Sequence, residues 1–223
     1  MSDEVISYVN RRSDPSASPE RHGEPLWVHP SIELACRDVL RRVRERGGTS
    51  IGVTSARRHE GRTTIAWGLA RANWGAGRRP TVLLDTASGG AHRPDKPGLS
   101  DVLSGDLSIL DAIEWVAPDL GVITAGHADS EASGVGALGS IIVVRDLEAA
   151  GLDIVADLPP LPPVGVGDRL AALFSVTLLV VKAGSTRLEL VRQAAATLPQ
   201  NPLVVLNGTS SAIPNWIPGL GGR

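Results

Sequence analysis

Short apolar runs alternate with longer stretches of mixed apolar and polar residues over most of the chain. Six runs have the length of β-strands, and they cover residues 49–54, 81–85, 120–124, 152–157, 176–183 and 202–207. Several of them are nearly continuous Val, Ile and Leu, which is typical of strands buried on both faces of a sheet. The stretches between them are mostly long enough for crossover helices. The pattern therefore predicts an α/β fold with a doubly wound, mostly parallel sheet and flanking helices.

The two ends of the chain differ from this central pattern. Residues 1–30 are rich in Ser, Pro, Arg and Glu and predict a flexible arm. Residues 31–210 carry the α/β pattern and begin with an amphipathic helix, SIELACRDVLRRVRERGG. Residues 211–223 form a predicted C-terminal tail, which is either docked through Trp216 or loose. The chain has 223 residues, 42% of them hydrophobic, which is enough for one sizeable core between these ends.

Charge and composition exclude several classes of function. The formal net charge of −2 gives no broad positive surface for nucleic acid. The longest apolar run, LAALFSVTLLVV, is shorter than the ~18 residues that a membrane-spanning helix needs. The first residues, MSDEVISYVNRR, lack the apolar stretch of a signal peptide. Cys36 is the only cysteine, so no intrachain disulfide can form, and we expect a soluble, cytoplasmic protein.

The five tryptophans are the main large aromatic side chains of a chain with one Phe and one Tyr. Trp67 and Trp74 are seven residues apart in a stretch with helical pattern, which puts them on one face of that helix. We expect both of them, and Trp115, to pack in the core.

The segment TSARRHEGRTT, residues 54–64, lies between the first predicted strand and a predicted helix. Strand, loop and helix are the context of a phosphate-binding P-loop, in which backbone N–H groups and the helix N-terminus face the phosphates. Gly61 lets the backbone come close to them, and Thr63 supplies a hydroxyl for Mg2+. The segment departs from the usual pattern G-x-x-x-x-G-K-S/T, because Ala56 replaces the first glycine and Arg62 replaces the lysine.

Two aspartates end strands of the predicted sheet, Asp85 after TVLL and Asp157 in LDIVADLPP. Ligands of parallel α/β sheets bind at the carboxyl ends of the strands, so the loop and both carboxylates meet at one edge. Two acids beside a phosphate loop suit an Mg2+ site and the activation of a water or hydroxyl. We therefore predict Asp85 and Asp157 as catalytic residues and, with Thr63, as metal ligands; the alternative for each acid is the cap of a turn. The predicted nucleotide-binding residues of the loop are Glu60, Gly61, Arg62, Thr63 and Thr64.

Several segments follow one another in an order and spacing that one family shares. GVTSARRHEGRTTIAWGLA stands at the position of its P-loop, VLLDTASGG at its second Walker motif, and LDIVADLPPL at its Walker B segment with paired prolines. GLSDVLSGDLSILDAI, LLVVKAGSTRLELVRQAAATL and VVLN match further segments. The chain thus resembles, from about Ser31 to Asn207, the bacterial tyrosine kinases of capsule and exopolysaccharide biosynthesis. This resemblance implies a P-loop fold like that of partitioning ATPases, with ATP and Mg2+ as cofactors.

The chain departs from this family at residues that carry its chemistry. Arg62 replaces the P-loop lysine with a bulkier, planar cation. Ala87 replaces the second aspartate of the second Walker motif, and residues 88–90 lack the arginine that follows it. The C-terminal tyrosine cluster that these kinases phosphorylate has no counterpart, since the only tyrosine is Tyr8. These differences predict impaired activity, although drift with retained function is the alternative reading of Arg62.

The resemblance also bears on residues outside the loop. It implies that Asn207 lies near the adenine base of the nucleotide. The alternative is that Asn207 and Gly208 only form the turn that ends the strand. The family forms rings through a helix with a glutamate and two arginines at three-residue steps. Here Glu33, Arg37 and Arg41 follow at four-residue steps, which is an ordinary salt-bridged stripe. A homo-oligomer therefore remains one alternative, and the family's ring motif does not predict it here.

Three functions fit these features. The first is a stand-alone cytoplasmic ATP-binding kinase or ATPase with weakened catalysis that regulates polysaccharide assembly or export. The second is a non-catalytic, pseudokinase-type regulator that docks on a membrane chain-length (co-polymerase) protein. The third is a partitioning-type ATPase. The family occurs either fused to membrane helices or as a separate chain, and the lack of a spanning segment predicts the second arrangement. A separate membrane partner would then recruit the chain to the inner face of the membrane.

Overall fold

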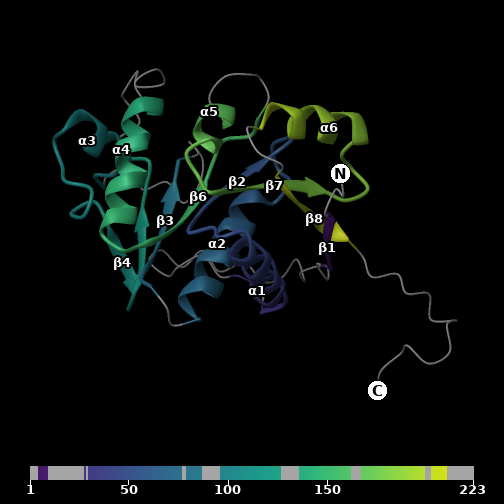
Figure 1. The fold of residues 1–223 in the computed structure, drawn as a ribbon, viewed down its shortest axis with the longest axis horizontal. Coiled ribbons are helices and arrows are strands. Elements are labelled where there is room, and N and C mark those ends of the chain that lie inside the picture. The colour runs from purple at the N-terminus through teal and green to yellow at the C-terminus, as the bar shows by residue number, and fades with distance from the viewer. Residues whose placement is uncertain are drawn as a thin grey trace, which may run out of the picture.

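The computed structural model describes most of the chain and forms one sheet with helices on both of its faces (Figure 1). The described residues are 5–9, 28, 30–76, 79–86, 96–126, 136–161, 167–198 and 202–209. The strands are β1 (Val5–Val9), β2 (Ser50–Ser55), β3 (Thr81–Asp85), β4 (Glu114–Ala117), β5 (Leu120–Ile123), β6 (Asp153–Asp157), β7 (Val176–Lys182) and β8 (Leu203–Thr209). The helices are α1 (Pro30–Glu45), α2 (Arg62–Trp74), α3 (Leu99–Ser104), α4 (Gly136–Ala149), α5 (Gly167–Ala171) and α6 (Leu188–Thr197).

The sheet has eight strands in the order β1-β8-β7-β2-β6-β3-β5-β4. Every described pairing is parallel except that of β4 with β5. All six strands predicted from the sequence are present, which confirms the doubly wound, mostly parallel α/β fold. Because β2 lies between β6 and β7, the residues that follow β2 emerge in the middle of the carboxyl edge of the sheet.

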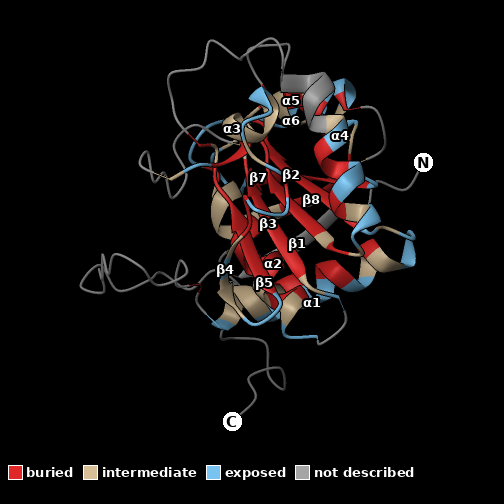
Figure 2. Cartoon of the chain, turned by 90° about the vertical axis from the view of Figure 1, so that its left-hand side faces the viewer, coloured by how far each residue is buried: buried red, intermediate tan, exposed pale blue. Residues whose placement is uncertain are grey.

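Two apolar clusters fill the space between the sheet and its helices, one on each face. Along β3, Leu83 belongs to the cluster under α1 and α2, while Val82 and Leu84 belong to the cluster under α3, α4, α5 and α6. This alternation follows from the two-residue period of a strand. Figure 2 shows the central strands buried along their length, as the continuous Val, Ile and Leu runs predict.

The tryptophan predictions are confirmed for one residue and wrong for another. Trp67 is buried in α2, and Trp74 is half-buried against the same cluster, where its indole nitrogen donates to the carbonyl oxygen of Pro118. Trp115 is 50% exposed. It lies on β4, the antiparallel strand at the sheet edge, where a strand's alternation turns every second side chain outward.

Strand β1 differs from the predicted flexible arm over residues 1–30. Val5–Val9 pairs in parallel with β8, with Val5 opposite Val204. Its sequence, VISYV, is rich in residues that favour strands, and β8 would otherwise leave the N–H and C=O groups of one edge unpaired. Most of the remaining arm and the predicted tail 211–223 lie outside the described residues.

The longest described helix, α1, has 16 residues. Within the ranges that the structure describes, no helix combines the length and apolar character needed to cross a membrane.

Helices α1 and α2 approach closely at Cys36, which predicts an inert thiol. Cys36 is 1% exposed, and a Cβ added at Gly68 would lie 2.8 Å from its sulfur. Burial, and to a lesser extent the charge of Glu33, raises the pKa of the Cys36 thiol to about 12. We expect the native protein to resist alkylation by iodoacetamide at pH 9, and the unfolded protein to react fast, as measured by intact mass. Labelling of the native protein at the rate of a free thiol would contradict this packing.

Candidate nucleotide-binding site

The loop between β2 and α2, residues 56–61, lies at the carboxyl edge of the sheet beside the ends of β6 and β7. Ala56 and Glu60 are buried, while Arg57, Arg58 and His59 are exposed. The loop is thus anchored in the core at both of its ends and turns two arginines toward solvent.

The carboxylate of Glu60 holds this loop in shape from the inside. It is 3% exposed and accepts hydrogen bonds from the backbone N–H of Arg57 at 2.8 Å and of Lys182 at 3.4 Å. The hydroxyl of Thr186 also donates to it. Lys182 ends β7, and Thr186 precedes α6, so Glu60 ties the loop to the β7–α6 connection. The contact of Glu60 with a nucleotide stays a prediction, because all of these hydrogen bonds come from groups of the protein itself.

Gly61 and Asn207 meet where the loop enters α2. Gly61 has a φ of 86°, in the left-handed region that favours glycine. A Cβ added there would lie 2.0 Å from Nδ2 of Asn207, and this amide nitrogen donates to the carbonyl oxygen of Glu60 at 2.9 Å. Asn207, on β8, therefore braces the loop, and a side chain at position 61 would have to push this amide aside. The role of Asn207 at an adenine base stays a prediction.

The start of α2 offers backbone N–H groups at the same place. Its N-cap residue, Gly61, makes no side-chain capping bond, and the first turn contains no acidic residue. The first N–H groups of a helix have no partner within the helix, and the helix dipole favours an anion beside them. The residues of this first turn include Thr63 and Thr64, both half-buried. The geometry suits a phosphate group, as the P-loop pattern predicts.

Asp157 bonds to two residues of this first turn. Nε of Arg62 donates to its Oδ1 at 2.5 Å, and Oγ1 of Thr63 donates to its Oδ2 at 2.6 Å. The Asp157 side chain is 2% exposed, and that of Arg62 is 14% exposed. Burial strengthens this ion pair, and it also makes either charge costly to leave alone.

The second predicted acid, Asp85, lies next to the first. Asp85 and Asp157 are register partners at the ends of β3 and β6, and Asp85 is 7% exposed. The next residue, Thr86, donates to the carbonyl oxygen of Asp157 through its N–H at 3.2 Å and its hydroxyl at 2.8 Å. The structure therefore brings both predicted acids and the loop to one edge of the sheet.

The contacts of Asp157 do not fit an Mg2+ ion held by this carboxylate. Mg2+ requires close, nearly octahedral oxygen ligands. Both oxygens of Asp157 already accept protein donors, and one of these donors is the cation Arg62. Among the described residues, no group of three or more His, Cys, Asp and Glu could hold a metal. The contacts of Asp157 therefore do not support its predicted metal-binding role, and the metal-binding roles of Thr63 and Asp85 stay predictions.

Some predicted features lie outside the described residues or are only partly described. Ala87 and residues 88–90 are outside, and of Tyr8 only the backbone position in β1 is described. The predicted stripe on α1 does form an ion pair, since Arg37 lies 3.2 Å from Glu33.

Sequence reasoning missed Thr86 and Thr186, two of the hydroxyls that support the site. Thr86 directly follows Asp85, so the sequence alone could have placed its hydroxyl at the end of the strand. Thr186 lies in the turn after β7, and its contact with Glu60 joins positions 126 residues apart. No local pattern marks such a contact.

The fold matches those of several solved structures. The kinase domain of the Escherichia coli tyrosine kinase ETK superposes with a TM-score of 0.73 at 18% identity, covering 92% of this chain and 90% of that one. The kinase domain of VpsO gives a TM-score of 0.68 at 24% identity, covering 78% and 90%. The cell division ATPase MinD of Pyrococcus furiosus gives 0.53 at 23% identity, covering 71% and 69%.

No model of a protein family matches the sequence, and neither does any curated protein. The predicted resemblance to bacterial tyrosine kinase domains is confirmed at the level of the fold. The chain has the P-loop α/β fold that these kinase domains share with the cell division ATPase.

Proposed function

We propose that the chain binds ATP at the loop 56–61 and regulates polysaccharide assembly or export, with weakened catalysis. The observation that carries this proposal is the position of the loop: it opens onto the uncapped start of α2, with Asp85 and Asp157 beside it. Phosphate binds at such helix starts because backbone N–H groups converge there. The fold match to tyrosine kinase domains supports the same ligand.

The contact between Arg62 and Asp157 supports weakened catalysis. Phosphoryl transfer depends on charges held in position around the transferred group. Here the residue at the P-loop lysine position has its Nε bonded to the Walker B acid at 2.5 Å. A further carboxylate is missing at position 87, where Ala87 stands in place of the second aspartate of the second Walker motif. Both features favour a regulator that binds ATP over a fast kinase.

The proposed setting of this activity is supported by the resemblance to the family, and not by contacts in the structure. Tyrosine kinases of capsule and exopolysaccharide systems work with a membrane chain-length protein, and we propose such a partner here, contacted from the cytoplasmic side. The second candidate is a regulator that docks on this partner without catalysis, which the Arg62–Asp157 pair favours. A partitioning-type ATPase has less support, because the match to MinD has a lower TM-score than the match to ETK.

ATP turnover by the wild type, by Arg62→Lys and by the double variant of Arg62→Lys with Ala87→Asp tests this proposal. We expect the wild type to hydrolyse ATP far below the ~1 s⁻¹ of slower kinases. Arg62→Lys should improve binding of Mg2+-ATP but leave turnover low, because holding phosphate and positioning a metal are separate tasks. Turnover should rise only in the double variant with Ala87→Asp, since residues of one site couple non-additively.

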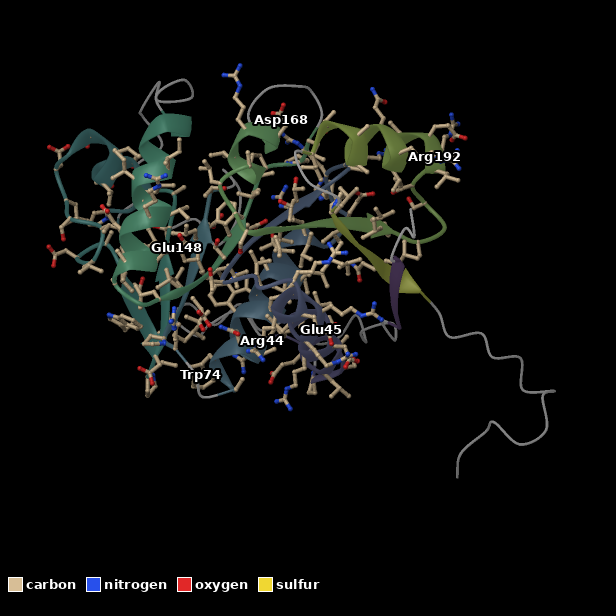
Figure 3. All side chains as sticks on the ribbon, in the orientation of Figure 1. Arg44, Glu45, Trp74, Glu148, Asp168 and Arg192 are labelled. Atoms are coloured by element: carbon tan, nitrogen blue, oxygen red, sulfur yellow. The ribbon has the colours of Figure 1, made fainter. Side chains whose placement is uncertain are left out.

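One control variant and two contradicting outcomes define this measurement. Arg192→Lys changes an exposed arginine on α6 (Figure 3) and should leave binding and turnover unchanged. A wild type that turns over at ~1 s⁻¹ would overturn weakened catalysis. A wild type that binds no ATP, with or without Mg2+, would overturn the proposed function itself.

A further inference from the structure

We propose that this site binds the nucleoside triphosphate without a divalent metal, and that the guanidinium of Arg62 supplies the positive charge in place of Mg2+. This inference rests on the proposed binding of ATP at the loop. It concerns how the phosphate charge is neutralised, which the P-loop pattern alone does not decide.

The first reason is that Asp157 is already neutralised. Its carboxylate is nearly fully buried, with Arg62 on one oxygen at 2.5 Å and Thr63 on the other at 2.6 Å. The hydroxyl of Thr63 could still face a metal, because a hydroxyl that donates one bond keeps lone pairs. Oδ1, however, faces a cation, and a second cation there would be repelled at close range in a buried setting. An Mg2+ ion would first have to displace Arg62.

The second reason is that Arg62 keeps donors for a ligand. Only its Nε is bonded to Asp157. Within the described part of the chain, the two terminal nitrogens of the guanidinium make no hydrogen bond that would occupy them. Arginine presents its donors as a planar fork that matches phosphate oxygens two at a time. Arg62 is the first residue of α2, so the turn that carries this fork also carries the uncapped N–H groups of the helix. Arg62 can therefore bridge Asp157 and a phosphate.

The third reason is the charge of the surrounding surface. Arg57 and Arg58 are exposed on the same loop. A bound triphosphate brings several negative charges, which Mg2+ normally offsets in P-loop sites. Here three arginines of one short segment, Arg57, Arg58 and Arg62, offer positive charge from the protein itself. These side chains can therefore offset the negative charge of a triphosphate that carries no metal ion.

The test measures the affinity for ATP by isothermal titration, once in EDTA and once in excess Mg2+. For the wild type we expect the two dissociation constants to agree within about threefold. For Arg62→Lys we expect affinity in EDTA to fall by about tenfold, because an ammonium cannot bridge the carboxylate and a phosphate as the fork does. The same variant should regain affinity when Mg2+ is added. Arg192→Lys, on α6, should behave as the wild type.

A second variant provides a test that does not depend on the folding of Arg62→Lys. Asp157→Asn preserves the shape of the side chain and removes its charge. It should retain ATP binding in EDTA within about threefold, because Arg62 remains free to hold phosphate. Wild-type binding that appears only with Mg2+, and is lost in Asp157→Asn, would overturn the metal-free site while leaving the proposed function standing. The absence of binding in both buffers would overturn both.

Discussion

Gly61→Ala is expected to weaken ATP binding by roughly a hundredfold or more, which corresponds to about 2.7 kcal/mol. The new Cβ would lie 2.0 Å from Nδ2 of Asn207, far inside contact distance. Either Asn207 must leave the carbonyl oxygen of Glu60, or the loop must move. The first change removes a brace of the loop, and the second moves the backbone N–H groups at the start of α2, where a phosphate would lie.

Gly105→Ala is the matched control for this prediction. Gly105 has the same φ of 86° as Gly61, but a Cβ added there meets nothing within 4 Å. Both variants carry the strain of a left-handed alanine, roughly 1–2 kcal/mol, so both should lose similar stability from this source. Only Gly61→Ala should lose binding in isothermal titration. Equal ATP affinity in the two variants would show that the loop at Gly61 does not contact the nucleotide.

The sequence predicts the sheet well because its strands are buried on both faces. Nearly continuous apolar runs such as TVLLD admit few other structures when helices separate them. The position of the loop and of Asp85 and Asp157 follows from the same logic, since parallel strands end at one edge. The fold and the approximate place of the site are therefore properties of pattern and order along the chain.

Other features depend on contacts that no pattern encodes. Val5–Val9 lies in a polar stretch and becomes a strand because the edge of β8 is available. Trp115 is apolar, yet its exposure is set by the edge position of β4. The direction of the Arg62 side chain depends on a carboxylate 95 residues away. Sequence reasoning could identify Arg62 as a departure from the P-loop pattern, but only the structure gives it a partner.

Arg62→Ala is expected to destabilise the protein by about 3–5 kcal/mol, the cost of leaving a buried charge without its partner. Asp157 is 1% exposed, and Asp85 lies beside it as its register partner. Removing the guanidinium would leave the buried Asp157 carboxylate next to another acid, with Thr63 as a remaining neutral donor. The measurement is chemical unfolding in urea, from which the free energy of unfolding is extrapolated.

Adding Asp157→Asn to Arg62→Ala separates this charge effect from the loss of packing around the arginine side chain. The amide is neutral and has nearly the shape of the carboxylate, so the double variant should recover most of the lost stability. With Asp157→Asn measured alone as well, the cycle gives the coupling energy, and a value above ~1 kcal/mol would be of the size expected for residues in direct contact. If the double variant were as unstable as Arg62→Ala, the cost would lie in packing, and Arg62 would not act as the counter-charge of Asp157. The same counter-charge is what makes an added metal ion unnecessary at this carboxylate, so the stability cycle bears on the binding site as well as on the fold.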